Sequence, residues 1–571
     1  MKKILIIGGV AGGATAAARL RRLDEHAEII IFERGEHISF ANCGLPYYIG
    51  GAIEDRRSLL QQTPQGFKKR FNIDVRVKSD VLAIERETKT VKVRNLLSGE
   101  VYTENYDKLI LSPGGAPIKA PIPGADSEKV FVLRNLSDTD RIKSYAISAA
   151  TKSAVVVGGG PVGMEMAENL RNTGLDVSII ELSDQLMAPL DFDMACQVHH
   201  YVKEKGIDLY LNTAVTEITD ESDGLYVRIE SRLNGNTRSD GETTATGYLK
   251  THMLIMAIGI KPESQLAKEA GLAVDERGGI EVNEHMRSSD ENIYAVGDAV
   301  VVTDFVTGAK SMIPLAGPAN KQGRIAADNI CEIPAKYTGT QGSSVLQVFD
   351  MTVAATGVNE KTAKRLELNY DKVFTRPMGH AAYYPGSRNM TLKVIFEKTS
   401  GRILGAQIVG FDGVDKRCDV LATAIRAGMN AADLTGLELC YAPPYSSAKD
   451  PVNMAGYVIE NILSGKVKNF HWHEVDALPR DGSVTLLDVR PALDHSINNI
   501  DGFINIPLDE LRKRMGELNR NKPVYVHCFV GLTSYIACRI LTQNGFDAYN
   551  LSGGFVLYQS VRQYNPYSYR L

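Results

Sequence analysis

The stretch that decides the fold is KILIIGGVAGGATAAARL, residues 3–20. A short aliphatic run is followed by a glycine-rich turn from Gly8 to Gly13 and then by an alanine-rich segment. This order predicts a buried parallel strand, a tight turn and a helix. A second aliphatic run, residues 28–32, ends in Glu33, 20 residues beyond Gly13. Together these features indicate a Rossmann-like α/β unit.

The same unit recurs later in the chain. Residues 153–157 form an aliphatic run, a full GxGxxG follows, and a further run at 176–180 ends in Glu181. A helix N-terminus behind such a turn offers unpaired N–H groups to a pyrophosphate, and the acid can accept a hydrogen bond from a ribose hydroxyl. Two units predict two bound dinucleotides; glycine turns that only pack a helix on a strand are the alternative. The residues concerned are Gly8, Gly13 and Glu33 in the first unit, and Gly158, Gly160, Gly163 and Glu181 in the second.

Length and composition limit the classes of protein to which the chain can belong. A chain of 571 residues is too long for one core, and 44% hydrophobic with 23% charged residues is an ordinary globular composition. The net charge of -4 gives no overall attraction to nucleic acid or to an anionic membrane. No apolar run suits a membrane span, and the apolar N-terminal stretch leads into the glycine turn rather than a cleavage site. We therefore expect a cytoplasmic protein.

Changes of pattern along the chain predict several domains. The stretches 106–114 and 251–262 each read as a strand that ends in a glycine turn. Such segments suit the points at which the chain crosses from one nucleotide unit to the other. From about residue 335 the runs suit an antiparallel sheet, and the last hundred residues suit a separate small α/β domain. The expected boundaries are 1–120 and 251–330 for the first nucleotide domain, 121–250 for the second, 331–460 for an α+β domain, 461–470 for a linker and 471–571 for the last domain.

The chain has seven cysteines, an odd number, with no CxxC pair and no zinc-like spacing, so neither a disulfide framework nor a metal site is expected. Cys43 lies in SFANCGLPYY, residues 39–48, and has no partner cysteine within ten residues. Cys528 follows an aliphatic run and opens a glycine-containing loop ahead of a helix. Loop N–H groups and the helix dipole can stabilise a thiolate or persulfide there. The alternative for Cys43 is a buried, inert thiol, and the alternative for Cys528 is an inactive docking domain.

The two glycine turns, the Cys43 segment and the strand end at Asp298 together resemble the flavoprotein pyridine nucleotide-disulfide oxidoreductases. Within that family, SFANCGLPYYIGG (39–51) and YAPPYS (441–446) resemble the coenzyme A-disulfide reductases. The last domain resembles a rhodanese in LDVR (487–490), NIP (505–507) and CFVGLTS (528–534). Fusions of these two parts are also described as NADH-dependent persulfide reductases.

The resemblance implies ligands for each site. FAD would be held by Gly8, Gly13, Glu33 and Asp298, and NADH by Gly158, Gly160, Gly163 and Glu181. Because Glu181 would repel a 2′-phosphate, NADH is preferred, although residues elsewhere leave NADPH use open. Coenzyme A would be contacted by Thr15, Arg19, Arg22, Ser39, Asn42 and Lys449.

The resemblance also implies catalytic roles. Cys43 would form a mixed disulfide with substrate sulfur, which the reduced flavin resolves. Tyr441 and the Tyr383-Tyr384 pair would enter the active site from the partner subunit of a homodimer, where a phenol can donate to the departing thiolate. Cys528 would handle sulfane sulfur in the rhodanese domain.

Two residues depart from these patterns. Asn320 stands where the simpler reductases have a substrate-binding histidine, so the pose of coenzyme A is expected to differ. Thr533 stands where a rhodanese loop commonly carries arginine, which makes thiosulfate a poor donor unless His527 reaches the sulfur.

The leading hypothesis is NADH-dependent reduction of coenzyme A persulfide, polysulfide or coenzyme A disulfide, with sulfur exchange across a flexible connector. The nearest alternative is an NADH oxidase or peroxidase in which Cys43 cycles through sulfenic acid. A sensor or carrier without turnover, and a last domain that only docks, are further alternatives.

Overall fold

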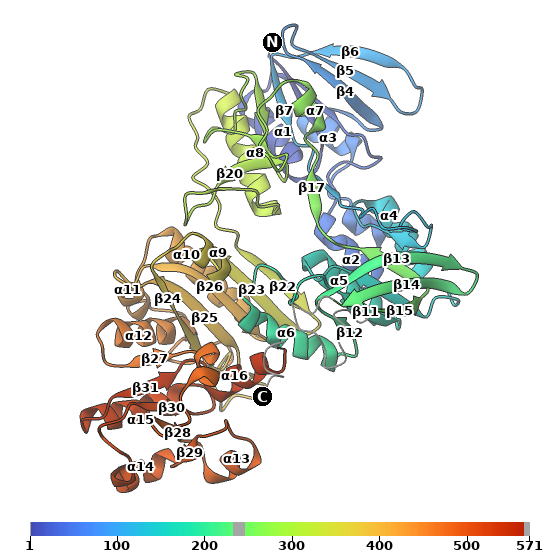
Figure 1. The fold of residues 1–571 in the computed structure, drawn as a ribbon. Coiled ribbons are helices and arrows are strands. Elements are labelled where there is room, and N and C mark those ends of the chain that lie inside the picture. The colour runs from blue at the N-terminus through green and yellow to red at the C-terminus, as the bar shows by residue number, and fades with distance from the viewer. Residues whose placement is uncertain (1, 232–245, 565–571) are drawn as a thin grey trace. The chain divides into compact units, whose positions relative to one another are not determined.

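The computed structural model describes residues 2–231 and 246–564, shown in Figure 1. The chain forms two units: one contains the residues up to Ser183 together with Gly206–Gly342, and the other contains Asp184–Lys205 together with the residues from Ser343 onward. Among the described residues, no helix is both long and apolar enough to cross a membrane.

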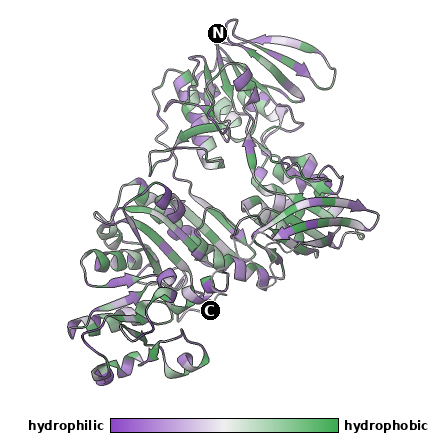
Figure 2. Ribbon diagram, in the orientation of Figure 1, coloured by the Kyte–Doolittle hydropathy of each residue, from purple (hydrophilic) through white to green (hydrophobic). Residues whose placement is uncertain are grey.

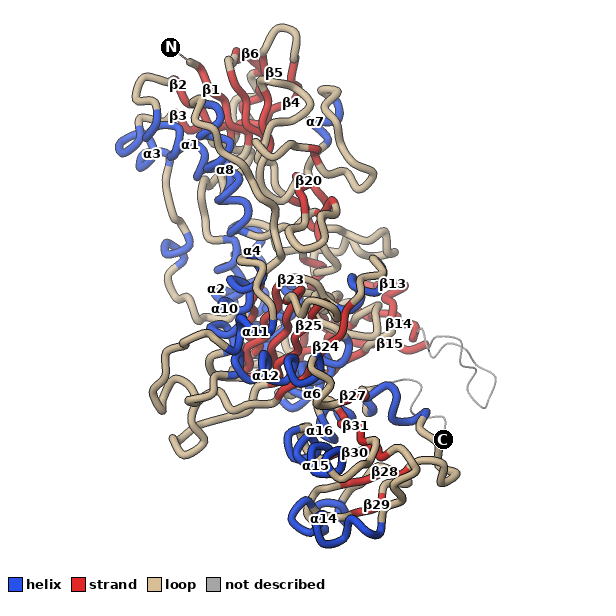
Figure 3. The backbone as a smooth tube through the Cα atoms, turned by 90° about the vertical axis from the view of Figure 1, so that its left-hand side faces the viewer, coloured by secondary structure: helices blue, strands red, loops and turns tan. Residues whose placement is uncertain are grey.

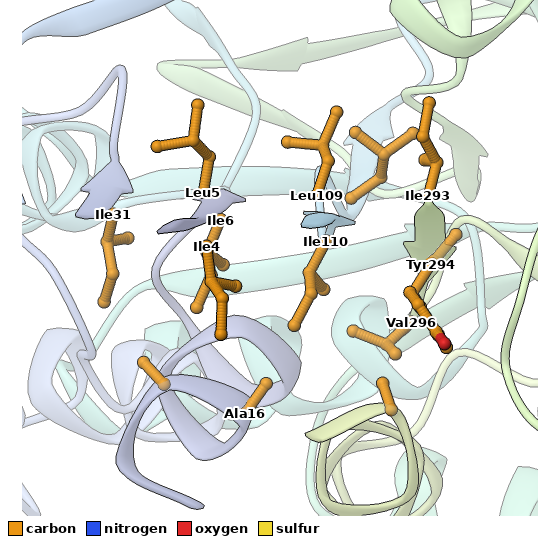
Figure 4. Packing of buried hydrophobic residues seen from close by; sticks show 14 of the residues in the cluster. Ile4, Leu5, Ile6, Ala16, Ile31, Leu109, Ile110, Ile293, Tyr294 and Val296 are labelled. Carbon is orange, nitrogen blue, oxygen red and sulfur yellow. The ribbon is translucent and has the colours of Figure 1, made fainter. Parts of the chain in front are cut away.

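The first sheet of the first unit is parallel and five-stranded, in the order β19-β7-β1-β2-β3. Its strands are β1 (Lys3–Ile7), β2 (Glu28–Phe32), β3 (Asp74–Arg76), β7 (Lys108–Leu111) and β19 (Ile293–Ala295). Side chains alternate along β1, so that Ile4 and Ile6 face α1 (Ala11–Leu23) while Leu5 points to the other side of the sheet (Figure 4). The carboxyl ends of β1, β2 and β19 thus lie at one edge, where Rossmann-like folds bind their ligand.

Smaller elements complete this domain. The helices are α2 (Leu45–Ile49), α3 (Pro64–Phe71), α7 (Gln265–Glu269) and α8 (Ala316–Ile330), with the short 3₁₀ turns η1 (Asn42–Gly44) and η2 (Arg56–Leu59). Two three-stranded sheets are formed by β4 (Ser79–Glu85), β5 (Thr90–Asn95) and β6 (Val101–Asn105), and by β18 (Ile280–Glu281), β20 (Val300–Thr303) and β21 (Lys310–Ser311).

The second nucleotide domain repeats the parallel arrangement in the order β12-β11-β10-β16-β9. Its elements are β9 (Val130–Phe131), α4 (Leu136–Ala146), β10 (Ser153–Val157), α5 (Pro161–Asn172), β11 (Asp176–Ile180), β12 (Asp208–Tyr210) and β16 (Met253–Met256). An antiparallel sheet is added by β13 (Thr213–Glu221), β14 (Gly224–Ser231) and β15 (Thr246–Thr251). The strands β8 (Gly115–Pro117) and β17 (Ile260–Pro262), which lie before and after this domain in the sequence, form an antiparallel pair.

The second unit begins with the helix α6 (Phe192–Glu204) and an antiparallel sheet in the order β22-β23-β26-β25-β24. The strands are β22 (Ser344–Val348), β23 (Met351–Gly357), β24 (Tyr370–Thr375), β25 (Thr391–Glu397) and β26 (Ile403–Gly410). The helices are α9 (Glu360–Arg365), α10 (Val414–Arg426), α11 (Ala431–Thr435) and α12 (Pro451–Leu463). Every residue of β26 is buried, and much of this sheet is hydrophobic in Figure 2. The helices α10, α11 and α12 lie along one side of it (Figure 3).

The last domain is a parallel sheet in the order β27-β31-β30-β28-β29. Its elements are β27 (Lys468–Phe470), η3 (Trp472–Ala477), β28 (Thr485–Asp488), α13 (Ala492–Ile497), β29 (Ile504–Asn505), α14 (Leu508–Arg514), η4 (Met515–Glu517), β30 (Val524–His527), α15 (Leu532–Gln543), β31 (Ala548–Leu551) and α16 (Gly554–Arg562). Because α12 ends at Leu463 and β27 begins at Lys468, only residues 464–467 separate the two domains. The mixed α/β fold class predicted from the sequence is confirmed.

A buried charge cluster lies where the two domains of the second unit meet. The ammonium of Lys393 is fully buried, 2.9 Å from Asp191, 2.8 Å from Asp193 and 2.6 Å from Glu360. Burial alone would raise the pKa of Glu360, but the neighbouring lysine charges hold it below its usual range. The indole N–H of Trp472 donates to Asp193 at 3.1 Å, so the last domain is joined directly to this cluster.

Candidate active site

The first glycine turn is shaped to receive a pyrophosphate. Gly8 has a φ of +93°, and a Cβ on it would lie 2.1 Å from the carbonyl oxygen of Ser112. A Cβ on Gly13 would lie 2.0 Å from the carbonyl oxygen of Gly8, so α1 sits directly on the turn. The first turn of α1 has no acidic residue and no side-chain cap. Its N–H groups and the helix dipole are therefore available to an anion.

Two acids stand at the strand ends around this turn. Glu33 follows β2, and its carboxylate accepts from the N–H of Gly9 at 3.0 Å and of Gly35 at 2.7 Å. Asp298 comes after Gly297, which has a φ of +88°, beyond the end of β19. Burial raises the pKa of Asp298. Both acids line one cavity of 610 Å³, which also contains residues of the glycine turn and Cys43. These residues fit the flavin dinucleotide that the sequence predicts.

The second glycine turn has the same construction. Gly158 has a φ of +105°, and a Cβ on Gly163 would lie 1.9 Å from the carbonyl oxygen of Gly158. A Cβ on Gly160 would meet open space, so its missing side chain leaves room for a ligand rather than for the protein. The carboxylate of Glu181 accepts from the N–H of Gly159 at 2.6 Å and from the N–H of Ser183 at 2.8 Å. This loop fits a second dinucleotide.

Cys43 lies in η1, directly ahead of α2, and its residue is exposed to solvent. The N–H of Ser39 donates to the carbonyl of Gly9 at 2.9 Å, which ties the Cys43 segment to the first glycine turn. Partial burial of the sulfur, and then the charges of Glu165 and Asp298, raise the pKa of the Cys43 thiol. In the described part of the chain, no hydrogen bond from another residue reaches this sulfur. The thiol therefore depends on what binds beside it for activation.

Sequence reasoning missed Glu165, which lines the same cavity as Cys43. Burial raises the pKa of its carboxyl to about 7. The hydroxyl of Tyr47, four residues after Cys43, donates to it at 3.3 Å. Glu165 lies in α5, two residues beyond Gly163, but no signal in the sequence shows that its side of the helix faces this cavity.

The predicted coenzyme A residues of the first unit lie mostly along α1. The hydroxyl of Thr15 donates to the amide oxygen of Asn320 at 2.6 Å, so the residue that replaces the expected histidine contacts a predicted ligand residue. Arg19 pairs with Asp328 at 2.7 Å, and Arg22, one turn on, is exposed. Asn42 lines the cavity beside Cys43, and Ser39 has a φ of +49°.

The remaining predicted residues of the reductase lie in the second unit. The hydroxyls of Tyr383 and Tyr441 are 2.9 Å apart, although 58 residues separate them in the sequence. This hydrogen bond raises the pKa of Tyr383. Both tyrosines are exposed, 76% for Tyr383 and 48% for Tyr441, and Lys449 is exposed as well. Tyr384 packs edge-on against His380.

Cys528 is 1% exposed and follows β30. Its sulfur accepts from the N–H of Gly531 at 3.2 Å and lies 3.2 Å from the hydroxyl of Ser534. Gly531 has a φ of +94°, a conformation that favours glycine and turns its N–H toward the sulfur. The amide oxygen of Asn550 lies 2.6 Å from the same hydroxyl, so the single hydroxyl proton is shared between two acceptors, this oxygen and the sulfur. The loop is thus a preformed cradle for negative charge on sulfur.

His527 does not supply the positive charge that is missing from the loop because Thr533 stands in place of an arginine. Its ring is fully buried between the rings of Phe503 and Phe555, and burial lowers its pKa to about 4. The ring is therefore neutral at physiological pH. Among the described residues it makes no hydrogen bond to the sulfur, because neighbouring strand residues point to opposite faces. The buried cation Arg490 lies 5.2 Å from the Phe529 ring, but Asp488 neutralises it at 2.7 Å.

Comparisons with known proteins agree with this construction. Residues 2–323 match the pyridine nucleotide-disulphide oxidoreductase family, residues 344–451 its dimerisation domain, and residues 471–560 the rhodanese-like domain. The chain belongs to the pyridine nucleotide-disulphide oxidoreductase family and carries a rhodanese-like domain at its C-terminal end. It is accordingly an oxidoreductase of an FAD- and NAD(H)-dependent family.

Three individual proteins are similar to this chain over most of its length. The coenzyme A disulfide reductase of Staphylococcus haemolyticus is 36% identical over 458 residues, which cover 80% of this chain and 99% of that protein. The structure of reduced CoADR-RHD from Bacillus anthracis is 50% identical, with a TM-score of 0.93 and 98% of each chain covered. A NAD-dependent persulfide reductase from A. fulgidus is 37% identical, with a TM-score of 0.88, covering 97% of this chain and 99% of that one.

Proposed function

We propose that this enzyme uses NADH to reduce coenzyme A persulfide, polysulfide or coenzyme A disulfide through Cys43. The observation that carries the proposal is that the first glycine turn, Glu33, Asp298 and Cys43 line one and the same cavity of the first unit. A relay of two electrons from NADH to sulfur is the chemistry that bound FAD would supply. The relatives named for coenzyme A disulfide and persulfide reduction support this choice of substrates.

The chemistry at Cys43 begins with its thiolate. With coenzyme A persulfide, the Cys43 thiolate attacks the coenzyme A sulfur, forms a mixed disulfide and displaces sulfide. Two electrons from NADH then break that disulfide, releasing the coenzyme A thiol and restoring Cys43. The balance is one persulfide, one NADH and one proton giving one thiol, one hydrogen sulfide and NAD⁺. Protonation of Glu165, whose pKa is about 7, would remove a charge that opposes the thiolate.

Coenzyme A would lie along α1, with Thr15, Arg19 and Arg22 on one helix face at spacings of four and three residues. Ser39 and Asn42 would complete the site beside Cys43. Lys449, Tyr383 and Tyr441 would come from the partner subunit of a homodimer, and the phenol pair would donate to the departing thiolate. The dimerisation domain at 344–451 and the exposure of both tyrosines support this arrangement.

Cys528 would accept and deliver sulfane sulfur. Its cradle consists of an N–H and a hydroxyl without an unpaired cation, which suits a persulfide better than the dianion thiosulfate. All seven cysteines are free, which favours a reducing compartment such as the cytoplasm.

The test compares Cys43→Ser and Cys528→Ser for NADH-dependent product release from the three substrates. Cys43→Ser is expected to lower all three activities by on the order of 10³-fold or more, because the nucleophile is lost. Cys528→Ser is expected to leave both coenzyme A substrates unchanged and to impair turnover from polysulfide. Cys331→Ser, another free cysteine of the first unit, is the control. Near-normal turnover by Cys43→Ser would refute the proposal.

An NADH oxidase or peroxidase is the second candidate. A water-forming NADH oxidase from Lactobacillus brevis is 28% identical, with a TM-score of 0.75 over 82% of this chain. In that case Cys43 would cycle through sulfenic acid. Steady-state turnover with oxygen or peroxide above that with coenzyme A persulfide would favour this candidate. The fused rhodanese-like domain favours the sulfur substrates instead.

A further inference from the structure

The segment that carries Tyr441, residues 441–446 with the sequence YAPPYS, has no helix or strand of its own. Part of it lines a cavity of 450 Å³ in the second unit, to which Tyr441, Pro444 and Tyr445 contribute. Tyr445 is also exposed. A loop with open space beside it has few contacts of its own, so fixed groups elsewhere must hold Tyr441 if its hydroxyl is to keep one position.

Arg417, on α10, supplies such contacts from a fully buried position. Its guanidinium donates to the hydroxyl oxygen of Ser446 at 2.8 Å and, at the longer distance of 3.5 Å, to the carbonyl of Tyr445. A further N–H of the same group donates to the carbonyl of Gly413 at 3.2 Å. One guanidinium therefore binds two consecutive residues of the loop and the backbone ahead of α10.

The charge of Arg417 is balanced by Asp450, the N-cap residue of α12. Two guanidinium nitrogens lie 3.2 and 3.0 Å from one carboxylate oxygen, and the hydroxyl of Ser446 lies 2.8 Å from the same oxygen. The carbonyl of Ser447 is a more distant acceptor for that hydroxyl, at 3.2 Å. The other carboxylate oxygen accepts from the N–H of Val452 at 3.0 Å. Because both buried charges are paired and hydrogen-bonded, the network joins α10, the loop and the start of α12 firmly.

The backbone ahead of α10 leaves room for this guanidinium. Gly413 is the N-cap residue of α10 and has a φ of +68°, a left-handed conformation that favours glycine. A Cβ at this position would lie 2.0 Å from a guanidinium nitrogen of Arg417. Both the conformation and the close approach therefore require glycine where the arginine is enclosed.

The loop connects this network to the tyrosine pair. The hydroxyls of Tyr383 and Tyr441 are 2.9 Å apart, and the N–H of Ala381 donates to the carbonyl of Pro443 at 3.3 Å. Within the described part of the chain, Tyr441 makes no side-chain hydrogen bond besides the one to Tyr383. The position of its hydroxyl therefore depends on the backbone of the loop, and the buried guanidinium holds that backbone.

We propose that Arg417 is a positioning residue for the reductase reaction: through Ser446 it fixes the loop, so that the hydroxyl of Tyr441 stays beside that of Tyr383. The inference rests on the proposed function, which gives this phenol pair the task of donating to the departing thiolate. Arg417 acts through the loop and not on the substrate itself. Such an effect can be large, because a displacement of about 1 Å in a catalytic group can lower the rate about 100-fold.

The first readout is hydrogen–deuterium exchange of the full-length flavoprotein. Ser446→Ala separates the loop from the network and leaves the buried pair of Arg417 and Asp450 intact, whereas Arg417→Lys keeps a charge beside Asp450 but loses the planar fork that reaches both partners. In both variants a peptide spanning 441–449 should exchange about threefold faster or more, and a peptide from the second half of α10 should not change. Ser447→Ala is the control, because Ser447 contributes only its carbonyl to the network.

The second readout is kcat for NADH-dependent reduction of coenzyme A disulfide, measured with and without Tyr441→Phe. Ser446→Ala should lower kcat about fivefold in the native background and less than about 1.5-fold beside Tyr441→Phe, because a residue that acts through a hydroxyl has no effect once that hydroxyl is absent. A structural role alone would lower kcat equally in both backgrounds.

Two outcomes would overturn the positioning role itself: unchanged exchange of the 441–449 peptide in both variants, or an equal loss of kcat in the two backgrounds. Native turnover by Tyr441→Phe, together with faster exchange in Ser446→Ala, would instead refute the part that the proposed function gives to this phenol. The catalytic purpose assigned to Arg417 would then fall with it, although the loop would still be held.

Discussion

Cys43 lies within the 3₁₀ turn η1 and Cys528 follows β30 at a glycine-containing loop, and their sulfur atoms meet opposite surroundings. Cys528 is buried, and its sulfur is held by the N–H of Gly531 and the hydroxyl of Ser534. Cys43 is exposed at a wide cavity, and partial burial of its sulfur, followed by the charges of nearby carboxylates, raises the pKa of its thiol. The Cys528 sulfur thus has hydrogen-bonding partners within the chain. The Cys43 sulfur has none among the described residues, so its partners would come from a bound ligand.

The difference has a physical origin. If Cys528 carries a persulfide, as proposed, it must stabilise negative charge on sulfur, and the N–H of Gly531 in the loop would serve that purpose. A redox thiol that alternates between a dinucleotide and a substrate needs open space on both sides. The residues that line the Cys43 cavity therefore suit the binding of ligands, and they do not stabilise the thiolate of Cys43. The two thiols should accordingly respond to different substitutions.

The largest expected effect comes from Arg490→Gln. Burial alone would raise the pKa of Asp488, but Arg490 holds it below its usual value, so the substitution leaves a buried carboxylate whose remaining side-chain partner is His495 at 2.9 Å. The rhodanese-like domain should lose about 3–5 kcal/mol of unfolding free energy. Trp472, the single tryptophan, belongs to this domain, so its fluorescence during urea unfolding measures the loss.

The matched control for Arg490→Gln is the exposed Arg512→Gln. Reduction of coenzyme A disulfide should stay within about twofold in both variants, because Cys43 lies in the other unit. A parallel loss of that activity in Arg490→Gln would show that the two cysteine sites are not independent.

A smaller effect is expected from Ser534→Ala, which removes the hydroxyl that lies 3.2 Å from the Cys528 sulfur and can donate its proton to it in place of Asn550. Polysulfide-dependent turnover should fall about tenfold, since a hydrogen bond to a charged group is worth about 1.5–3 kcal/mol. Steady-state kinetics with polysulfide and with coenzyme A disulfide would measure the contrast, with the exposed Ser496→Ala as control. Unchanged polysulfide turnover would mean that the cradle does not act on the reacting sulfur.

The smallest effect is expected at Cys43, from Glu165→Gln. The pKa of Glu165 is about 7, so at pH 6 the native residue is mostly neutral and resembles glutamine. At pH 8 its charge raises the pKa of Cys43 and lowers the thiolate fraction. After removal of bound thiol, the variant should be alkylated by iodoacetamide at the native rate at pH 6 and about threefold faster at pH 8.

Peptide mass spectrometry would follow this reaction at Cys43, with the exposed Cys440 of the second unit as the internal reference. A rate ratio that does not change between pH 6 and pH 8 would contradict the role assigned to the Glu165 charge.

Much of the site was predictable from local pattern. A strand, a glycine turn and an acid at the next strand end are a short-range signal, and both nucleotide loops have the predicted form. Glu165 was not found, because nothing in the sequence shows that its side of α5 faces the cavity of the other domain. Likewise, the sequence shows that Thr533 stands in place of a positively charged arginine. It does not show that His527 is buried between two aromatic rings.

The sequence by itself determined the two nucleotide-binding units, the family and the identity of the two candidate sulfur-handling cysteines, because each depends on residues close together in the chain. Only the tertiary structure decided which distant side chains meet. It joined Tyr383 to Tyr441 and gathered Asp191, Asp193 and Glu360 around Lys393. Contacts of this kind depend on how sheets and helices pack, and packing is set by the whole chain rather than by any local run of residues.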